Sequence, residues 1–212
     1  MKHFDRSIRI RNGDDNIGIV TFFADFDEAS LSELTDAMPG VTIAAVKVDD
    51  WNSELSPWEA PAVFGDKGFG SGAPEMLDYI TGELIPGMGC DRYIIGGYSL
   101  AGLFSLWACY ESDVFTGCCA SSPSVWFPEW DSFIGDHRFK ADLAYLSLGD
   151  KESKTRNPVM RTVADRIELQ YQSLSDSIGS DNVVLEWNKG NHFQDPTGRK
   201  VRSFQWMLDR MG

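Results

Sequence analysis

Basic residues are scarce in this sequence, and no run of them occurs. Its 212 residues include 19 Lys and Arg against 32 Asp and Glu, which gives a formal net charge of -13 at pH 7. A chain of this charge repels the phosphates of nucleic acids and anionic lipid headgroups. We therefore expect no nucleic-acid partner and no binding to a membrane surface.

Cysteines and long apolar stretches are also few. The four cysteines form no C-x-x-C pair and do not lie beside histidines at zinc-ligand spacing; Cys118 and Cys119 adjoin in an apolar run and are expected to be small buried residues. No apolar stretch reaches the ~18 residues of a membrane span. The N-terminal sequence MKHFDRSIRIRNGDD lacks the apolar segment of a signal peptide. These absences predict a cytoplasmic protein without a metal.

Length and apolar pattern fit one domain of the α/β class. A single core can serve chains of up to roughly 250 residues, and no repeat or linker interrupts the sequence, so residues 1–212 are predicted to form a single domain. Continuous apolar runs alternate with helical periodicity, which is typical of a mostly parallel sheet with helices on both faces. The expected strands are 16–23, 41–46, 92–98, 115–121, 142–148 and 182–187, and the expected helices are 30–37, 73–85, 99–110, 158–178 and 196–211.

The strongest chemical signal is a serine between an expected strand and an expected helix. The segment Gly97-Tyr98-Ser99-Leu100-Ala101 follows the G-x-S-x-G pattern of a nucleophile elbow, with alanine in place of the second glycine. Small residues on both sides of the serine let strand and helix approach closely, which exposes the serine oxygen. A serine that only caps a helix would look similar, so the remaining members of a catalytic triad must decide.

One of the three histidines stands where a catalytic base is expected. His3 lies at the start of the chain and His137 in a polar turn, whereas His192 follows the last expected strand and precedes the last helix. The α/β-hydrolase order of serine, acid and histidine places the base at this point. A lone loop histidine is usually only a solvated residue, so the weight of His192 comes from its position.

The acid that orients this histidine should follow the fifth expected strand. Both Asp150 and Glu152 lie in the turn after Gly149. We favour Glu152, because the tight glycine turn must be completed before a side chain can reach back, and Asp150 stays an alternative. Ser99, Glu152 and His192 then follow one another in the required order.

Loop residues are expected to frame this site. The backbone N–H of Leu100 would donate one hydrogen bond to an oxyanion, and a second would come from segment 24–27, in which we choose Asp25. Aromatic side chains at the carboxyl ends of the strands are candidates for substrate binding, although such residues more often belong to a core. These candidates are Trp58, Tyr98 and Trp126.

Together these segments resemble the esterase D-like and enterobactin esterase-like group of α/β-hydrolases. That group includes S-formylglutathione hydrolases, feruloyl and acetyl-xylan esterases and enterobactin-type siderophore esterases. The resemblance runs from about residue 20 to the C-terminus. Beside the elbow, it rests on the segments SPW (56–58), ASSPSVW (120–126), LGDKE (148–152) and GNHF (190–193).

The resemblance implies a fold and a set of roles. It implies a compact α/β-hydrolase fold with Ser99 as nucleophile and His192 as base. It supports Glu152 as the acid less firmly, because some siderophore esterases of this kind manage with a Ser–His pair. The chain is shorter than most members of the group, which leaves little room for a lid.

We therefore expect a serine hydrolase that cleaves carboxylic esters of a small or sugar-linked substrate through an acyl-enzyme on Ser99, with no cofactor. An acyltransferase would use the same nucleophile to pass the acyl group to an alcohol or a sugar. A third alternative is a hydrolase fold that serves as a non-catalytic binding protein, which a missing triad member would favour. The aromatic loop residues equally suit a contact between copies of the chain, so a homo-oligomer stays open.

Overall fold

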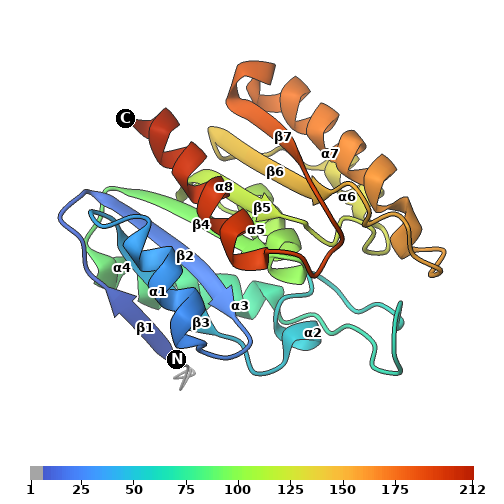
Figure 1. Ribbon diagram of the computed structural model, residues 1–212, viewed down its shortest axis with the longest axis horizontal. Helices are drawn as coiled ribbons and strands as arrows, with labels where there is room; N and C mark the ends of the chain where they lie inside the picture. The colour runs from blue at the N-terminus through green and yellow to red at the C-terminus, as the bar shows by residue number, and fades with distance from the viewer. Residues whose placement is uncertain (1–6) are drawn as a thin grey trace.

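The computed structural model describes residues 7–212, and a seven-stranded sheet runs through them (Figure 1). The strands are β1 (Ile8–Arg11), β2 (Ile17–Phe23), β3 (Thr42–Lys47), β4 (Arg92–Tyr98), β5 (Phe115–Ser121), β6 (Leu143–Gly149) and β7 (Val183–Asn188). They lie in the order β1-β3-β2-β4-β5-β6-β7. The pairs are parallel except for β1 and β3, which are antiparallel. The mostly parallel sheet predicted from the apolar runs is confirmed.

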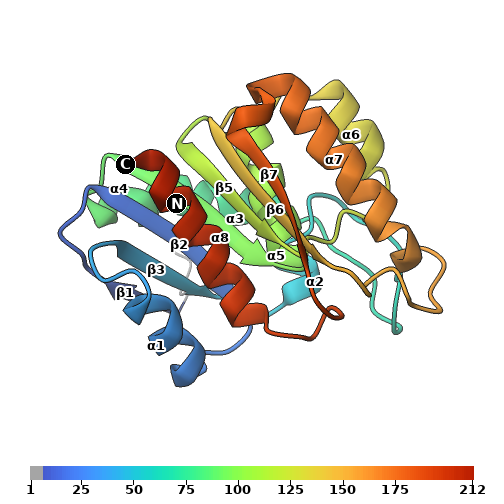
Figure 2. The ribbon, with the colours of Figure 1, turned by 45° about the horizontal axis from the view of Figure 1, so that its top comes forward.

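Helices cover both faces of this sheet, as the sequence predicts (Figures 1 and 2). One face carries α1 (Glu28–Asp36) and α8 (Pro196–Met211), which pack against each other. The opposite face carries α3 (Ala73–Tyr79), α4 (Ile85–Met88), α5 (Leu100–Glu111) and α7 (Val163–Ile178). Two further helices are α2 (Trp51–Glu54), near the strand ends, and α6 (Trp130–Asp136), which packs on α7. Within residues 7–212, no helix has both the length and the apolar character of a membrane span.

The core consists of two apolar layers, one on each face of the sheet. Helix α5 is buried from residue 100 to residue 110, because a helix that is apolar on all sides is stable only when protein surrounds it. Helix α8 is amphipathic and presents Val201, Phe204 and Met207 to the opposite face. Cys118 and Cys119 are buried as free thiols in β5, where small residues are expected.

Several element boundaries differ from those that the periodicity predicts. The expected helix 73–85 is divided by a π-helical turn, Ile80–Leu84, just before Pro86, whose missing N–H cannot continue the α-helical hydrogen bonding. The expected helix 158–178 begins later: Asn157 does accept hydrogen bonds from the next turn, but that turn is a 3-10 helix that leads into α7. The sequence predicts neither β1 nor α6.

The topology brings the carboxyl ends of four neighbouring strands together. Tyr98 at the end of β4 pairs with Ser121 of β5, and Gly149 at the end of β6 pairs with Asn188 of β7. On its other side β4 pairs with β2, where the strand order changes direction. Ligands bind in the crevice at such a switch point. The loops after β4, β6 and β7 carry the predicted triad.

Candidate active site

Ser99 occupies a strained turn between β4 and α5. Its φ of 61° and ψ of -122° lie in a region that residues other than glycine rarely adopt. Backbone hydrogen bonds hold this conformation: the N–H of Ser99 donates to Ser121 O (3.1 Å), and its carbonyl accepts from the N–H of Ser124 (3.1 Å). The hydroxyl therefore stands at the N-terminus of α5, at the carboxyl edge of the sheet.

Small residues make this turn feasible. A Cβ at Gly97 would lie 2.6 Å from the Cβ of Ala101, and a Cβ at Gly102 would lie 3.2 Å from the carbonyl oxygen of Gly97. The contact between Gly97 and Ala101 explains the departure from the G-x-S-x-G pattern. Alanine fits at the second position because the first is a glycine.

The three residues of the predicted triad form one chain of contacts. Nε2 of His192 lies 3.0 Å from Oγ of Ser99, and Nδ1 of His192 lies 2.7 Å from Oε2 of Glu152. The side chain of Glu152 is 4% exposed and that of His192 is 26% exposed. When the protonated Nδ1 donates to the carboxylate, Nε2 is left free to accept the proton of the Ser99 hydroxyl. The arrangement can thus remove that proton.

The two candidate acids have different partners. Glu152 contacts His192, and its Oε1 accepts hydrogen bonds from Gly149 N (2.7 Å) and Ser122 Oγ (2.8 Å). The carboxylate of Asp150 instead accepts a hydrogen bond from Gly190 N (2.8 Å), in the loop that precedes the histidine. The turn closes through a hydrogen bond from Glu152 N to Gly149 O (3.0 Å), after which the glutamate side chain points back toward the histidine.

The environment of Glu152 favours its ionised form. Burial raises the pKa of Glu152, but the hydrogen bonds and charge of His192, together with the hydrogen bonds from Ser122 and Gly149, outweigh it and hold the pKa below its ordinary value. A carboxylate that stays charged can stabilise a protonated histidine.

The predicted oxyanion donors lie at the ends of β4 and β2. Leu100 is buried in the first turn of α5, where a backbone N–H has no acceptor within the helix. Asp25 lies in the exposed loop after β2, and its carboxylate accepts a hydrogen bond from Phe26 N (2.9 Å). The structure also places Oγ of Ser124 3.4 Å from Oγ of Ser99, a neighbour that the sequence analysis does not identify. The roles of the Leu100 and Asp25 amides stay predictions.

Two of the three predicted aromatic residues lie beside His192. The hydroxyl of Tyr98 donates to His192 O (2.7 Å), and the two rings are 5.2 Å apart between centroids. Trp126 lines a cavity of about 30 Å³ together with His192 and with Met160 and Val163 from the start of the α7 segment.

Trp58 has different surroundings. Its Nε1 donates to Pro128 O (3.1 Å), and its ring packs against Phe127, Trp130 and Phe133. The open surface beside this ring is formed with α6 rather than with His192. The predicted contact of Trp58 with substrate stays a prediction.

The other two histidines lie away from the predicted triad or outside the described residues. His137 is exposed at the end of α6, where its ring stacks on Phe133 with centroids 4.1 Å apart. His3 lies outside the described residues. Across residues 7–212, no group of three or more His, Cys, Asp or Glu side chains is arranged to hold a metal ion.

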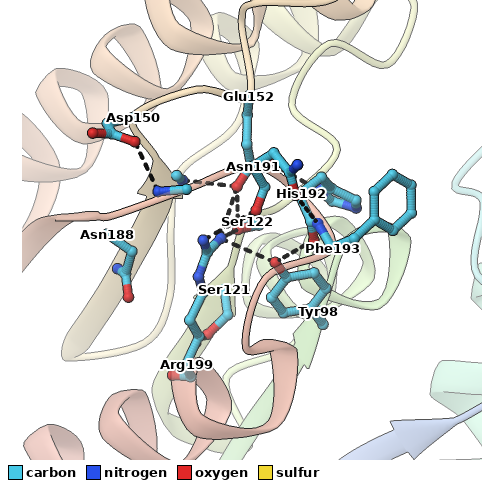
Figure 3. Close-up of polar contacts among 12 residues, drawn as sticks. Tyr98, Ser121, Ser122, Asp150, Glu152, Asn188, Asn191, His192, Phe193 and Arg199 are labelled. Carbon is cyan, nitrogen blue, oxygen red and sulfur yellow. Dashed lines mark hydrogen bonds and ion pairs between the residues drawn. The ribbon is translucent and has the colours of Figure 1, made fainter.

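The sequence analysis also misses Arg199 and Phe193, which Figure 3 shows on opposite sides of His192. Arg199 of α8 is 1% exposed and contacts Glu152, whereas Phe193 is 86% exposed beside His192. The only sequence signal for Arg199 is its place one turn into an amphipathic helix, next to a second cation.

Comparisons with known proteins identify the fold. No protein-family model matches the sequence, and no curated protein matches it. The siderophore hydrolase EstA from Aspergillus nidulans matches with a TM-score of 0.72 and 16% identity over 94% of this chain and 84% of its own. An IroE-like serine hydrolase from Shewanella oneidensis matches with a TM-score of 0.76 and 13% identity over 98% and 77% of the two chains.

A third structure matches almost end to end. Acyl-protein thioesterase 2 from Zea mays has a TM-score of 0.60 and 13% identity, over 97% of this chain and 99% of its own. The chain therefore has the α/β-hydrolase fold, as the sequence predicts. At these identities the similarity establishes the fold and not the substrate.

Proposed function

We propose that this chain is a serine hydrolase that cleaves carboxylic esters. The observation that carries the proposal is the series of contacts from Ser99 Oγ to His192 Nε2 (3.0 Å) and from His192 Nδ1 to Glu152 Oε2 (2.7 Å). Its first member stands in a strained turn at a helix N-terminus, which a serine with only a capping role does not need. The named hydrolases and thioesterase among the structural matches support the same class of reaction.

The reaction proceeds in two stages through an acyl-enzyme. Ser99 Oγ bonds to the acyl carbon of the ester while its proton passes to His192 Nε2. The bond from the acyl carbon to the alcohol oxygen then breaks, and that oxygen takes the proton from His192. Water next gives a proton to His192 Nε2 while its oxygen bonds to the acyl carbon. The bond from the acyl carbon to Ser99 Oγ then breaks, Oγ takes the proton back from His192, and the carboxylic acid leaves.

The protein stabilises the charges that develop in these steps. Glu152 keeps Nδ1 of His192 protonated and balances the imidazolium. The N–H of Leu100 and a donor from segment 24–27 are the proposed partners of the oxyanion, where the loss of one donor typically costs about 3 kcal/mol.

The space beside the triad supports a small substrate group. The cavity that Trp126, Met160 and Val163 form next to His192 has a volume of about 30 Å³, far below the roughly 300–1,000 Å³ of ordinary ligand pockets. We propose that the acyl group is short, and the proposal predicts that activity falls as the acyl chain lengthens.

The test is hydrolysis of p-nitrophenyl acetate, butyrate and octanoate by the wild type and by Ser99→Ala, His192→Ala and Glu152→Ala. We expect the first two variants to lose about 10⁴-fold or more in kcat, and acetate to be preferred to octanoate. Asp150→Asn is the matched control, because an amide oxygen can still accept the hydrogen bond from Gly190 N; it should keep near-wild-type activity.

Covalent labelling tests the nucleophile without relying on a chosen substrate. A fluorophosphonate should label the wild type at Ser99 and leave Ser99→Ala unlabelled. An inactive wild type in which Ser99 is also unlabelled would overturn the proposal and favour a non-catalytic binding protein.

A further inference from the structure

A buried arginine lies beneath the triad acid. Arg199 of α8 is 1% exposed, and its Nη1 donates to Glu152 Oε1 (2.9 Å), Ser122 Oγ (2.9 Å) and Tyr98 Oη (3.0 Å). Its Nη2 donates to the carbonyl oxygen of Asn191 (3.1 Å), which precedes the catalytic histidine. Figure 3 shows the guanidinium at the centre of these contacts.

This one group joins the carboxyl ends of four strands and the loops that follow three of them. Tyr98 ends β4, Ser122 follows β5, Glu152 follows β6, and Asn191 follows β7. A guanidinium is planar and carries five N–H donors in a fixed arrangement. Because its partners come from different loops, a shift of Arg199 would move the acid and the histidine loop relative to each other.

Tyr98 extends the same network to the histidine itself. Its hydroxyl accepts a hydrogen bond from Arg199 and donates its own to His192 O (2.7 Å). Burial raises the pKa of Tyr98, so the phenol keeps the proton that it donates. The histidine is therefore held at its backbone through Tyr98 and at its ring through Glu152.

The two carboxylate oxygens of Glu152 face different cationic or ionisable groups. Oε2 of Glu152 faces His192, while Oε1 faces Arg199. The other titratable groups at this point are the phenol of Tyr98 and the carboxylate of Asp150, which is held by Gly190 N. In a triad without such a cation, the carboxylate alone balances the imidazolium; here a buried cation shares that carboxylate.

We propose that Arg199 is a positioning residue for ester hydrolysis: it holds Glu152 and the His192 loop in register, and its charge limits how strongly Glu152 stabilises protonated His192. This inference rests on the proposed function. It concerns a residue that touches neither the substrate nor the reacting atoms.

The experiment measures kcat, KM and the pH dependence of kcat/KM for p-nitrophenyl acetate in Arg199→Met and the wild type. We expect kcat to fall about 10²-fold, because small errors in position have effects of this size, with little change in KM. The acidic limb of kcat/KM should move to higher pH by about one unit, because Glu152 no longer shares its charge.

The position of the acidic limb of kcat/KM distinguishes a positioning and electrostatic role of Arg199 from a merely structural one. A structural role would reduce the fraction of enzyme that fluorophosphonate labels, without moving the limb to higher pH. Arg202→Met is the matched control: Arg202 lies on the same helix, is 42% exposed, and pairs with Glu186 and Asp195. It should keep the kcat and the limb of the wild type.

Two further variants keep the proposal open to refutation where Arg199→Met does not fold. Arg199→Lys retains the charge but cannot reach both carboxylate and carbonyl, so we expect a loss in kcat of at least about tenfold with an unmoved limb. Arg199→Ala should regain part of its activity when methylguanidinium is added, and an Arg202→Ala control should not. Wild-type kcat in Arg199→Lys, or an unmoved limb in folded Arg199→Met, would overturn the proposal.

The wild type shows which of the two proposals has failed. An inactive and unlabelled wild type removes the proposed function and the role of Arg199 with it. An active wild type with unaffected Arg199 variants removes only the role of Arg199.

Discussion

The first two turns of α8 place consecutive cations in opposite regions of the protein. Arg199 reaches the ends of the strands beneath the triad, whereas Lys200 lies between α8 and the side of the sheet that α1 covers. Both are nearly inaccessible to solvent, with 1% and 6% exposure respectively. Their surroundings differ in what replaces the water that each has lost.

Arg199 is surrounded by oxygen acceptors, including a carboxylate. The ammonium of Lys200 instead faces the ring of Phe23 at 3.9 Å. Burial lowers the pKa of Lys200 to about 8, and the charge of Glu33 only partly opposes this. What replaces the lost water therefore differs between the two cations: Arg199 has oxygen acceptors beside the proposed site, whereas Lys200 faces an aromatic ring and its burial is only partly compensated.

The largest expected effect comes from removing the charge that Arg199 faces. In Glu152→Gln, the side chain can still accept hydrogen bonds from Arg199 and Gly149, but its amide N–H₂ would face Nδ1 of His192. The histidine would then carry its proton on Nε2 and could not accept one from Ser99. We expect kcat to fall about 10⁴-fold, measured on p-nitrophenyl acetate.

The contribution of Glu152 to stability depends on pH, and Glu152→Gln measures it. The pKa of Glu152 is below its ordinary value of 4.5 in the folded state, so ionised Glu152 stabilises the fold above that pH and loses this effect as pH falls through the folded-state pKa. In urea unfolding from pH 7 to pH 3, the advantage of the wild type over Glu152→Gln should therefore shrink on acidification. A constant difference across this range would contradict the lowered pKa.

Replacing Lys200 should have the opposite effect on stability to replacing Glu152. Its folded-state pKa of about 8 lies below the ordinary 10.5, so at pH 7 the folded protein carries the full cost of a buried ammonium, on the order of 3 kcal/mol. Lys200→Met should therefore raise the free energy of unfolding by up to about that amount, with kcat unchanged. Arg199→Met should lower it, because the buried carboxylate of Glu152 would lose its arginine partner.

The pH dependence gives this prediction its sign. Between about pH 8 and pH 10.5 folded Lys200 is neutral while the unfolded chain still binds the proton. The free energy of unfolding of the wild type should therefore rise with pH relative to that of Lys200→Met. Urea unfolding at pH 7 and pH 10 measures the difference. The exposed Lys140→Met is the control and should change the free energy of unfolding by less than about 0.5 kcal/mol. An unchanged difference between the two pH values would contradict the shifted pKa.

The same two cations show where sequence reasoning ends. The order of strands and helices follows from apolar runs, and the rule that parallel strands end at one edge is enough to expect Ser99, Glu152 and His192 in neighbouring loops. The structure brings these three into contact. The role of Arg199 depends on acceptors at the ends of four separate strands, and no local pattern contains them.

A weaker signal does exist for Lys200, which lies four residues before Phe204 on the apolar stripe of α8. A cation on such a stripe indicates either that its burial destabilises the fold or that a buried partner compensates its charge. A search for continuous apolar runs does not find strand β1, because its four residues alternate between Ile and Arg. Its place in the sheet comes from pairing with β3. The π-helical turn before Pro86 is also invisible to periodicity, since the four residues of α4 that follow it are too few to show a change of helical phase.

A third cation of α8 supplies the smallest expected effect and separates burial from position on the helix. Arg202 pairs with Asp195 (3.1 Å), but both side chains are about half exposed, at 42% and 54%. Water and salt screen such a pair, so Arg202→Met should lower the free energy of unfolding by no more than about 0.5 kcal/mol, and less at high salt. Urea unfolding at low and high sodium chloride measures this difference. A loss as large as that of Arg199→Met would mean that the helix position, and not the buried acceptors, makes Arg199 distinctive.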